Sequence, residues 1–394
     1  MNIIIPEEVR YIIDTLESNG YEAYAVGGCV RDSISGTEPK DWDICTPALP
    51  EQTIKFFAGH NIIETGLQHG TITLRINHKS FEVTTYRVDG VYTDNRRPDK
   101  VGFVNDLRTD LSRRDFTVNA MAYNPEKGII DFFGGVKDLN SGIIKCVGDP
   151  NKRFQEDALR IMRAMRFASV LGFEIENKTS QAMLENKNLL QNISAERISA
   201  ELNKMITGKN IRNILSRHIS VIAEIIPEIS AVTDFIGFTG LENIPAAVAL
   251  RLTMLFCDIN IESETAKKIL RRLKYDRKTV ETVSQLILYY GFDILTERKH
   301  IKKWLNRIGE ERFRQLLEIK KADEIKFLLN EIIEQKQCFS LKDLALNGGD
   351  LIALKITESK KIGEILNKLL NMVIDEKIEN DKIKLSEAVE IMLK

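Results

Sequence analysis

Asp41 and Asp43 are the two residues of this sequence whose type and spacing most directly suggest metal chemistry. On a β-strand, residues i and i+2 point to the same face, so both carboxylates would meet at one spot. Two adjacent carboxylates repel each other unless a cation joins them, and Mg²⁺ binds in proteins through one or two carboxylates together with substrate phosphates. Taken alone, a D-x-D spacing is more often a solvated turn than a metal site. Glu82, in a later strand-like run, could add a third carboxylate.

A glycine turn, GGCVRD, precedes the carboxylate pair in the sequence. Gly27 and Gly28 lack side chains, so a phosphate could approach their backbone amide groups closely. Arg31 adds a planar, permanently charged guanidinium that suits a phosphate. A glycine pair alone is more often only a turn, and it is the arginine that favours a phosphate-binding interpretation.

Arg113, Arg114 and Asp115 form a second charged segment. One interpretation is a cluster of ion pairs at the surface. The other is that the arginines bind a triphosphate while Asp115 accepts hydrogen bonds from ribose hydroxyls. Recognition of a 2′-hydroxyl would indicate precursors of RNA and not of DNA.

Charged residues recur at every third position of a later segment, namely Asp157, Arg160, Arg163 and Arg166. At about 100° per residue, they would sweep a broad band along one helix. Apolar residues would supply the buried side of that helix: Leu159, Ile161, Met162 and Met165. A solvated basic face is the commoner meaning of such spacing, and a ligand-binding band is the alternative.

The elements that must position these residues differ between the two halves of the chain. Up to residue 145 the patterns predict a mixed α/β arrangement, with a helix over 6–19 and strands over 21–26, 71–76 and 80–86. From Asp149 onward, apolar residues recur at helical spacing, which predicts helices over 158–171, 211–226, 246–256 and 362–374. The polar stretch Arg87–Pro98 predicts a long loop, either functional or the tip of a hairpin.

The composition excludes several classes of protein without naming a function. The chain has 394 residues, and its 56 Lys and Arg against 57 Asp and Glu give a formal net charge of −1. This balance alone gives no hint of nucleic-acid binding. No stretch approaches the roughly 20 apolar residues of a membrane span, and the N-terminal residues lack the basic segment of a secretory signal. The five cysteines are scattered without a C-x-x-C pair, which favours a reducing cytoplasm over a disulfide framework or a zinc site.

Taken together and in order, five motifs carry a family resemblance: GGCVRD, DWDICT, EVTTYR, RRDFTVNAMA and EDALRIMRAMRFA. The sequence resembles the bacterial tRNA nucleotidyltransferases (CCA-adding enzymes) and poly(A) polymerases, class II of the polymerase-beta-like nucleotidyltransferases. The C-terminal segments DLALNGGDLIALKI and IGEILNKLLNMVI are similar to the tail of the CCA-adding members. The resemblance implies an α+β chain. A catalytic head with a mixed sheet (1–145) would be followed by a helical neck (146–207), a helical body (208–315) and a helical tail that binds tRNA (316–394).

The resemblance also implies a role for each motif. Asp41 and Asp43 would bind Mg²⁺, with Glu82 as a third catalytic candidate. The nucleotide would contact Gly28, Arg31, Arg114, Arg163 and Arg166, its ribose would be read by Asp115, and its base by Asp157 and Arg160. The implied reaction is attack of a tRNA 3′-hydroxyl on the α-phosphate of CTP or ATP, with release of diphosphate and assistance by two metal ions.

The chemistry of base reading follows from hydrogen-bond patterns. Cytosine and adenine each present an amino donor beside a ring-nitrogen acceptor, whereas uracil and guanine present the reverse order. An aspartate acceptor beside an arginine donor therefore suits C and A. The mismatched bases would leave buried polar groups unpaired, which a site built for hydrogen bonds rejects strongly.

Three alternative functions remain open at this stage: an enzyme that adds only the terminal A, a poly(A) polymerase, and a non-catalytic RNA-binding relative. The stretch Arg87–Pro98 resembles the family's flexible element for adding the terminal A, which argues against a CC-only enzyme. The body resembles a degenerate HD phosphohydrolase region in which Cys257 replaces a histidine, so no phosphohydrolase activity is expected. The partners expected are the tRNA 3′ end, CTP and ATP, with no membrane, and the oligomeric state is open, a homodimer included.

The basic run Arg298–Trp304, RKHIKKW, lies in the helical half of the chain. It could contact tRNA phosphates, or it could be a solvated helix face. Phosphate contacts would show as a strong dependence of binding on salt.

Overall fold

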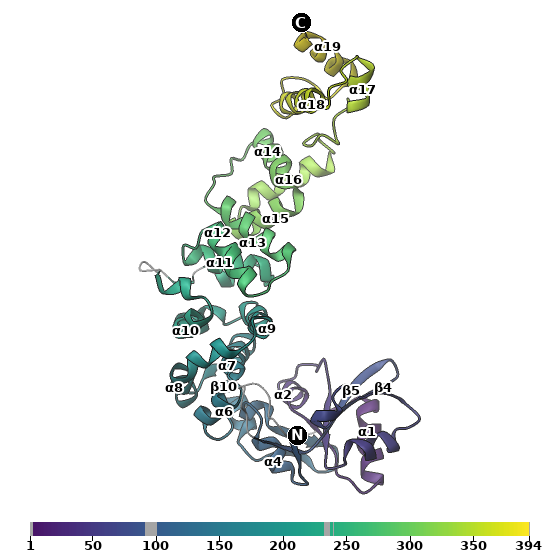
Figure 1. Cartoon of the computed structure of the whole chain (residues 1–394), viewed down its shortest axis with the longest axis vertical. Coiled ribbons are helices and arrows are strands. Elements are labelled where there is room, and N and C mark those ends of the chain that lie inside the picture. Colours follow the sequence, from purple (N-terminus) through teal and green to yellow (C-terminus); the bar gives the residue numbers. More distant parts are fainter. Residues whose placement is uncertain (1–2, 91–100, 232–236, 239, 394) are drawn as a thin grey trace. The chain divides into compact units, whose positions relative to one another are not determined.

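The computed structural model describes residues 3–90, 101–231, 237–238 and 240–393 (Figure 1). The chain divides into two compact units, one of residues 1–242 with 272–275 and one of residues 243–271 with 276–394. The division into head, neck, body and tail stays a prediction; its boundaries differ from these, because the predicted body (208–315) includes residues of both units.

The first unit is built on a mixed β-sheet whose strand order, within the described residues, is β3-β4-β5-β2-β1-β8-β9. Strands β2 and β5 run parallel, and the other neighbouring strands run antiparallel. The strands are β1 (Tyr24–Val26), β2 (Asp43–Thr46), β3 (Asn61–Ile63), β4 (Thr71–Ile76), β5 (Lys79–Thr85), β8 (Met121–Asn124) and β9 (Gly128–Asp131). The mixed sheet predicted for the N-terminal part is thus confirmed.

Short helices accompany this sheet: α1 (Glu7–Ser18), α2 (Gly28–Ile34), α3 (Pro50–Phe56), α4 (Leu107–Ser112) and α5 (Gly135–Asn140). Helix α1 forms where the spacing predicted it, because Val9, Ile12, Ile13 and Leu16 all fall on one buried face. Gly20, with a φ of 84°, follows the helix and lets the chain turn toward β1.

The stretch predicted as a loop over Arg87–Pro98 begins instead as a strand. Strand β6 (Arg87–Asp89) pairs antiparallel with β7 (Val101–Phe103). Three residues are too few for polar–apolar alternation to reveal a strand, which is why the sequence did not indicate it. Residues 91–98 of that stretch lie outside the described residues.

The part of the first unit after residue 145 is mainly helical, as predicted. Its helices are α6 (Pro150–Glu156), α7 (Leu159–Leu171), α8 (Asn177–Asn186), α9 (Ala195–Ile206) and α10 (Ile211–Ile225). One exception is β11 (Glu174–Ile175), which pairs in parallel with β10 (Ile143–Ile144). Helix α7 ends at Gly172, whose φ of 77° redirects the chain into this short strand.

The helices from residue 248 onward are α11 (Val248–Asp258), α12 (Ser263–Arg272), α13 (Arg277–Tyr290), α14 (Arg298–Ile308), α15 (Glu310–Lys320), α16 (Asp323–Glu334), α17 (Gly348–Ala353), α18 (Ser359–Ile374) and α19 (Lys382–Leu393). Near the C-terminus, Leu351, Leu369 and Leu385 bring α17, α18 and α19 into one apolar core. Across the ranges that the structure describes, no helix combines the length and apolar character needed to cross a membrane.

Candidate functional site

Three carboxylates lie along one face of the sheet where β2 begins. Asp43 is the first residue of β2, and its register partner on the parallel strand β5 is Glu82. Asp41 precedes the strand, so the prediction that both aspartates lie on a strand is wrong for Asp41. The exposed residues Asp41 and Asp43 nevertheless flank the buried Trp42. This alternation keeps both carboxylates on the exposed face.

The electrostatics of these carboxylates fit a divalent cation. Although Asp43 reaches solvent, the protein atoms around it and the Glu82 carboxylate raise its pKa to about 6, and Asp41 adds to this while Arg114 opposes it. Within the described ranges, no three acidic, imidazole or thiol side chains form a ready-made metal cluster. The donor set that fits is therefore two carboxylates completed by substrate phosphate, the arrangement that Mg²⁺ prefers.

The glycine turn is bordered by two guanidinium groups. Gly27 has a φ of 84°, and a Cβ built there would come within 2.9 Å of Nη1 of Arg114. A Cβ on Gly28 would come within 3.7 Å of Nη2 of Arg31. The missing side chain of Gly27 thus leaves room for the Arg114 guanidinium group, and an anion at the turn would lie near both arginines.

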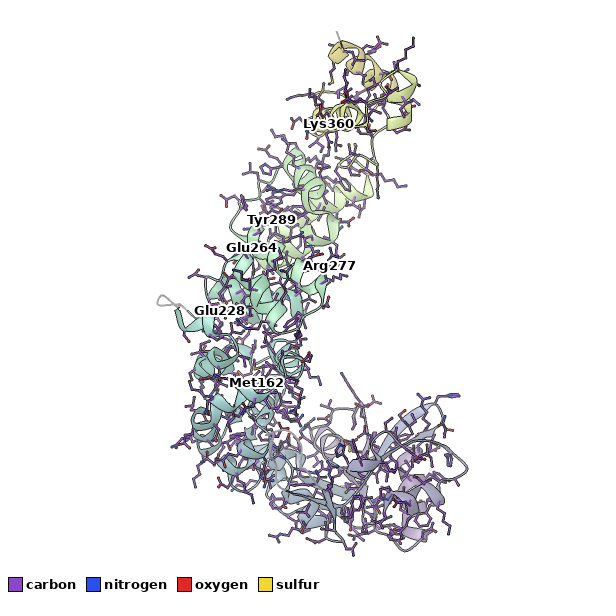
Figure 2. The ribbon with its side chains drawn as sticks, in the orientation of Figure 1. Met162, Glu228, Glu264, Arg277, Tyr289 and Lys360 are labelled. Carbon is purple, nitrogen blue, oxygen red and sulfur yellow. The ribbon has the colours of Figure 1, made fainter. Side chains whose placement is uncertain are left out.

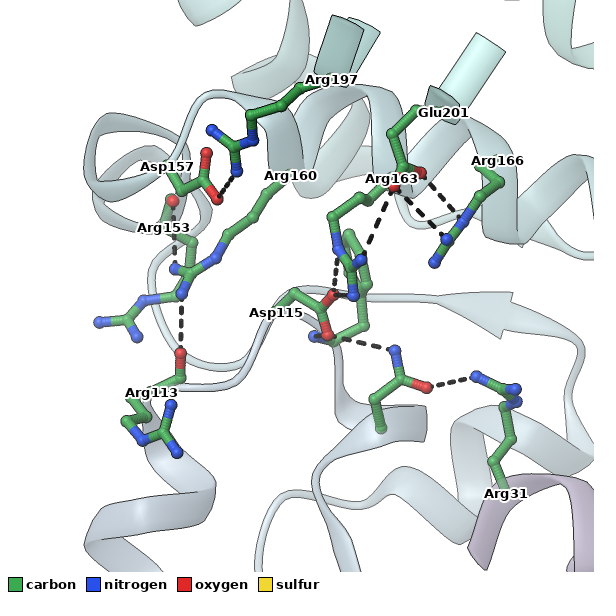
Figure 3. Close-up of polar contacts among 12 residues, drawn as sticks. Arg31, Arg113, Asp115, Arg153, Asp157, Arg160, Arg163, Arg166, Arg197 and Glu201 are labelled. Carbon is green, nitrogen blue, oxygen red and sulfur yellow. Dashed lines mark hydrogen bonds and ion pairs between the residues drawn. The ribbon is translucent and has the colours of Figure 1, made fainter. Parts of the chain in front are cut away.

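A hydrogen-bonded chain links Arg31 to Asp115 (Figure 3). Nη1 of Arg31 donates to Oδ1 of Asn119 at 2.6 Å, and Nδ2 of Asn119 donates to Oδ1 of Asp115 at 3.1 Å. Arg163 donates from Nε and Nη2 to Oδ2 of Asp115, at 2.8 and 2.6 Å. Burial alone would raise the pKa of Asp115, but Arg163 and the Asn119 amide outweigh it and hold the pKa at about 2. Asp115 is therefore a permanent acceptor at neutral pH.

These polar contacts continue from Arg163 and Arg166 on α7 to Glu201 on α9. Glu201 lies 3.1 Å from Nε of Arg166 and 3.8 Å from Nη1 of Arg163. The guanidinium carbons of Arg31, Arg163 and Arg166 lie 5.2, 5.3 and 4.0 Å from the centre of the Phe167 ring. Burial and the neighbouring Arg163 lower the pKa of Arg166 to about 10. One aromatic ring thus gathers three guanidinium groups, each of which also pairs with a carboxylate: Arg31 with Asp32, Arg163 with Asp115 and Arg166 with Glu201.

The segment around Asp157 differs from the single helical band that the sequence predicted. Asp157 takes extended dihedral angles (φ −140°, ψ 103°) and separates α6 from α7. Its Oδ1 accepts a hydrogen bond from the backbone N–H of Leu159 at 3.1 Å, and its Oδ2 accepts one from Nη2 of Arg197 at 3.0 Å. Asp157 is therefore not part of the helix that carries Arg163 and Arg166.

Arg160 is held by partners other than Asp157. Its Nη1 donates to Oε2 of Glu156 at 2.8 Å, and its Nη2 donates to the backbone carbonyl of Arg113 at 2.9 Å. The two residues expected to read the base are thus each fixed separately, by Arg197 and by Glu156. Figure 3 shows Asp157 and Arg160 on the same side of the Asp115 contacts.

Comparison with known proteins gives these residues a context. The CCA-adding enzyme of Lactobacillus delbrueckii subsp. bulgaricus is 36% identical over 385 residues, which is 96% of each chain. That of Enterococcus faecalis is 34% identical over 383 residues, 95% of this chain and 93% of the other. This chain belongs to the CCA-adding enzymes. The solved CCA-adding enzyme of Bacillus stearothermophilus in complex with CTP has a TM-score of 0.82 at 29% identity, over 99% of both chains.

Family models match three separate regions of this CCA-adding family member. Residues 23–145 match the poly A polymerase head domain, and residues 247–389 match tRNA nucleotidyltransferase domain 2. Residues 172–232 match a model described as an RNA- and SrmB-binding site of polymerase A. The head match contains Asp41, Asp43 and Glu82, so the three carboxylates lie in the part of the chain common to this family.

Four contributors to this site were not predicted as functional residues of a CCA-adding enzyme: Asn119, Phe167, Arg197 and Glu201. Asn119 lies in the motif RRDFTVNAMA and Phe167 in EDALRIMRAMRFA. Their place inside these motifs was the signal that could have identified them. Arg197 and Glu201 lie on α9, where charged residues at helical spacing resemble a solvated face. Only the packing of α9 against α7 brings them to the site.

Proposed function

We propose that this chain transfers CMP from CTP and AMP from ATP to the 3′ end of tRNA, completing the CCA sequence and releasing diphosphate. Membership of the CCA-adding enzymes supports this reaction. The observation that carries the proposal is the juxtaposition of Asp43 and Glu82 in a sheet whose adjoining glycine turn is bordered by Arg31 and Arg114.

Asp41 and Asp43 would hold Mg²⁺, with Glu82 near enough to assist. Divalent ions held there would supply Lewis-acid stabilisation for the negative charge that develops on the α-phosphate and on the attacking and leaving oxygen atoms, as in two-metal catalysis. Arg31 and Arg114 hold the triphosphate against the glycine turn. No side-chain nucleophile is required, because the RNA hydroxyl attacks directly.

Arg163, Arg166 and Asp115 would hold the rest of the nucleotide. The two arginines compensate phosphate charge. Asp115 is ionised, and its oxygen atoms already accept hydrogen bonds from Asn119 and Arg163. A ribose hydroxyl would therefore join a carboxylate whose orientation is fixed in advance, which limits the entropy lost on binding.

Selection of C and A is assigned to Asp157 and Arg160. Arg197 orients the Asp157 carboxylate at 3.0 Å, and Glu156 orients the Arg160 guanidinium at 2.8 Å. An acceptor and a donor fixed independently match the pairing edges of cytosine and adenine. A base with the reverse pattern leaves both groups unpaired.

The helical parts beyond the head are assigned to the RNA. The neck (146–207) would read the nucleotide, while the body (208–315) and the tail (316–394) would hold the tRNA. This division is an inference from the family, and the boundaries are part of the proposal.

One experiment separates this function from its neighbours. The purified protein is given tRNA ending before CCA, after C and after CC, each with CTP, ATP or both, in the presence of Mg²⁺. Completion of CCA on all three substrates supports the proposal. Addition only to the CC-ending substrate would indicate an A-adding enzyme, and a long A tail on unrelated RNA would indicate a poly(A) polymerase.

A further inference from the structure

An exposed aromatic and cationic surface lies in the second unit, far along the sequence from the catalytic residues. The guanidinium carbon of Arg307 lies 5.0 Å from the ring centre of Tyr289 and 5.8 Å from that of Phe292. Phe292 is 47% exposed, and the nearby leucines Leu288 and Leu295 are also about half exposed. We call Tyr289, Phe292 and Arg307 the Arg307 platform; Figure 2 labels Tyr289 on α13.

Buried aromatic side chains hold this platform in place. The Trp304 ring is 5% exposed and lies edge-on to Tyr289 at 5.4 Å and to Phe292 at 6.3 Å. Behind it, the fully buried Phe313 stacks on Trp304 at 6.1 Å with an interplanar angle of 5°. The exposed Phe292 ring and the partly buried Tyr289 ring therefore rest on a rigid support, and a ligand would not have to order them.

Arg307 differs from the lysines and the other arginine of α14 in its ion pairing. Each of those residues pairs with an acidic side chain: Arg298 with Glu331, Lys299 with Glu297, Lys302 with Glu376 and Lys303 with Asp375. These pairs favour the interpretation of the basic run as a neutralised helix face. Arg307 has no acidic partner among the residues that the structure describes, and Asp293, next to Phe292, does not supply one.

We propose that the Arg307 platform stacks an unpaired base of the RNA substrate, while the Arg307 guanidinium contacts that nucleotide's phosphate. The inference rests on the proposed function, which supplies RNA as the partner. Single-stranded bases stack on aromatic rings and on arginine planes, and a nucleotide supplies the negative charge as well as the ring. An apolar protein surface fits less well, because it would bury the Arg307 charge without a partner.

Three substitutions separate stacking from simple charge attraction. Arg307→Lys keeps the charge without the planar group, Arg307→Gln removes the charge, and Phe292→Leu keeps an apolar side chain without the ring. The measurement is the Kd for tRNA, by fluorescence anisotropy at one salt concentration, together with the KM for CTP. We expect each variant to raise the Kd for tRNA roughly five- to tenfold, which is the low end of the loss expected when one stacked base is removed. The KM for CTP should be unchanged.

Arg277→Gln is the matched control. Arg277 lies on the same helix as Tyr289 and its side chain is 89% exposed. It forms an ion pair with Glu281 of that helix. The control removes one positive charge from the same unit, so we expect a Kd within twofold of that of the unaltered enzyme. Thermal unfolding at unchanged Tm establishes that all four variants are folded.

The outcomes are distinguishable. Weaker tRNA binding by Arg307→Lys and Phe292→Leu, but not by Arg277→Gln, supports stacking. Binding that survives in Arg307→Lys and is lost in Arg307→Gln would reduce the platform to a phosphate contact and overturn the stacking proposal. Unchanged binding by all variants of an enzyme that still completes CCA would refute the platform alone, whereas an unaltered protein that neither binds nor extends tRNA would refute the proposed function and with it this RNA partner.

Discussion

Asp43 and Glu82 stand opposite each other in register on the parallel strands β2 and β5. The sheet pairing therefore forces two negative charges together at the point where Asp41 adds a third. Without a cation this arrangement is unfavourable, and it is stabilised by whatever positive charge binds there.

The first prediction is that Asp43→Asn stabilises the metal-free protein. The folded-state pKa of about 6 lies above the ordinary value of 3.8, so the native state loses stability as pH rises from 4 through 6. At pH 7.5 we expect the variant to be more stable by at most about 1 kcal/mol, because solvent screens an exposed carboxylate. Chemical denaturation in the presence of EDTA measures the free energy of unfolding of both proteins. The difference between them should vanish at pH 4 and shrink when Mg²⁺ is added. A variant that is less stable than the unaltered protein under all conditions would contradict the prediction.

The second prediction concerns Asp115, whose stabilising effect has the opposite sign. Its folded-state pKa of about 2 lies below the ordinary 3.8, so its contribution is complete above pH 4 and is lost as the pH falls toward 2. With a side chain only 9% exposed, Asp115→Asn should cost about 2 kcal/mol of unfolding free energy at pH 7. The loss of unfolding free energy caused by the substitution should become smaller below pH 4. An equal cost at pH 7 and at pH 2.5, where most of this contribution is lost, would show that the charge of Asp115 does not matter.

The third prediction is that Asn119→Leu weakens nucleotide binding more than it slows turnover. The substitution removes the side chain that joins Arg31 to Asp115 while keeping similar volume. We expect the KM for CTP and ATP to rise roughly tenfold, since two charge-assisted hydrogen bonds are lost, one to the Arg31 guanidinium and one to the Asp115 carboxylate. Asn367→Leu, at an exposed position of α18, is the control. A change confined to kcat would argue that Asn119 acts elsewhere in the reaction.

The fourth prediction is that Asp157→Ala relaxes the choice among the four nucleotides more than it reduces total incorporation. The acceptor that matches the amino groups of cytosine and adenine disappears, and Arg197 loses its partner. The ratio of UMP and GMP to CMP and AMP incorporated should rise at least roughly tenfold. Equal losses with all four nucleotides would refute base reading by Asp157.

The sequence predicted the elements that depend on local periodicity. Helix α7 forms over Leu159–Leu171 because apolar residues recur at three- and four-residue spacing. That spacing also placed Arg163 and Arg166 on one helix. The break at Asp157 was missed, because Glu156, Asp157 and Ala158 are all compatible with a helix. The break depends on Asp157 accepting a hydrogen bond from the backbone of Leu159.

Contacts between distant segments could not be predicted in the same way. Glu82 was recognised as a candidate, but its position opposite Asp43 is set by the pairing of β2 with β5, which joins residues 39 positions apart in the sequence. Likewise, Arg197 and Glu201 become part of the site only because α9 packs on α7. The motifs identified the residue types, and the tertiary structure supplies their partners.

The most direct test of the account is extension of a tRNA lacking CCA by the unaltered enzyme and by Asp43→Ala, with CTP, ATP and Mg²⁺. Single-nucleotide gel resolution gives the product length, and anisotropy gives the tRNA affinity. We expect the unaltered enzyme to add three nucleotides, and the variant to be slower by at least about 1,000-fold while binding tRNA equally well. A variant that still completes CCA at a comparable rate would contradict the assignment of catalysis to the Asp43–Glu82 site.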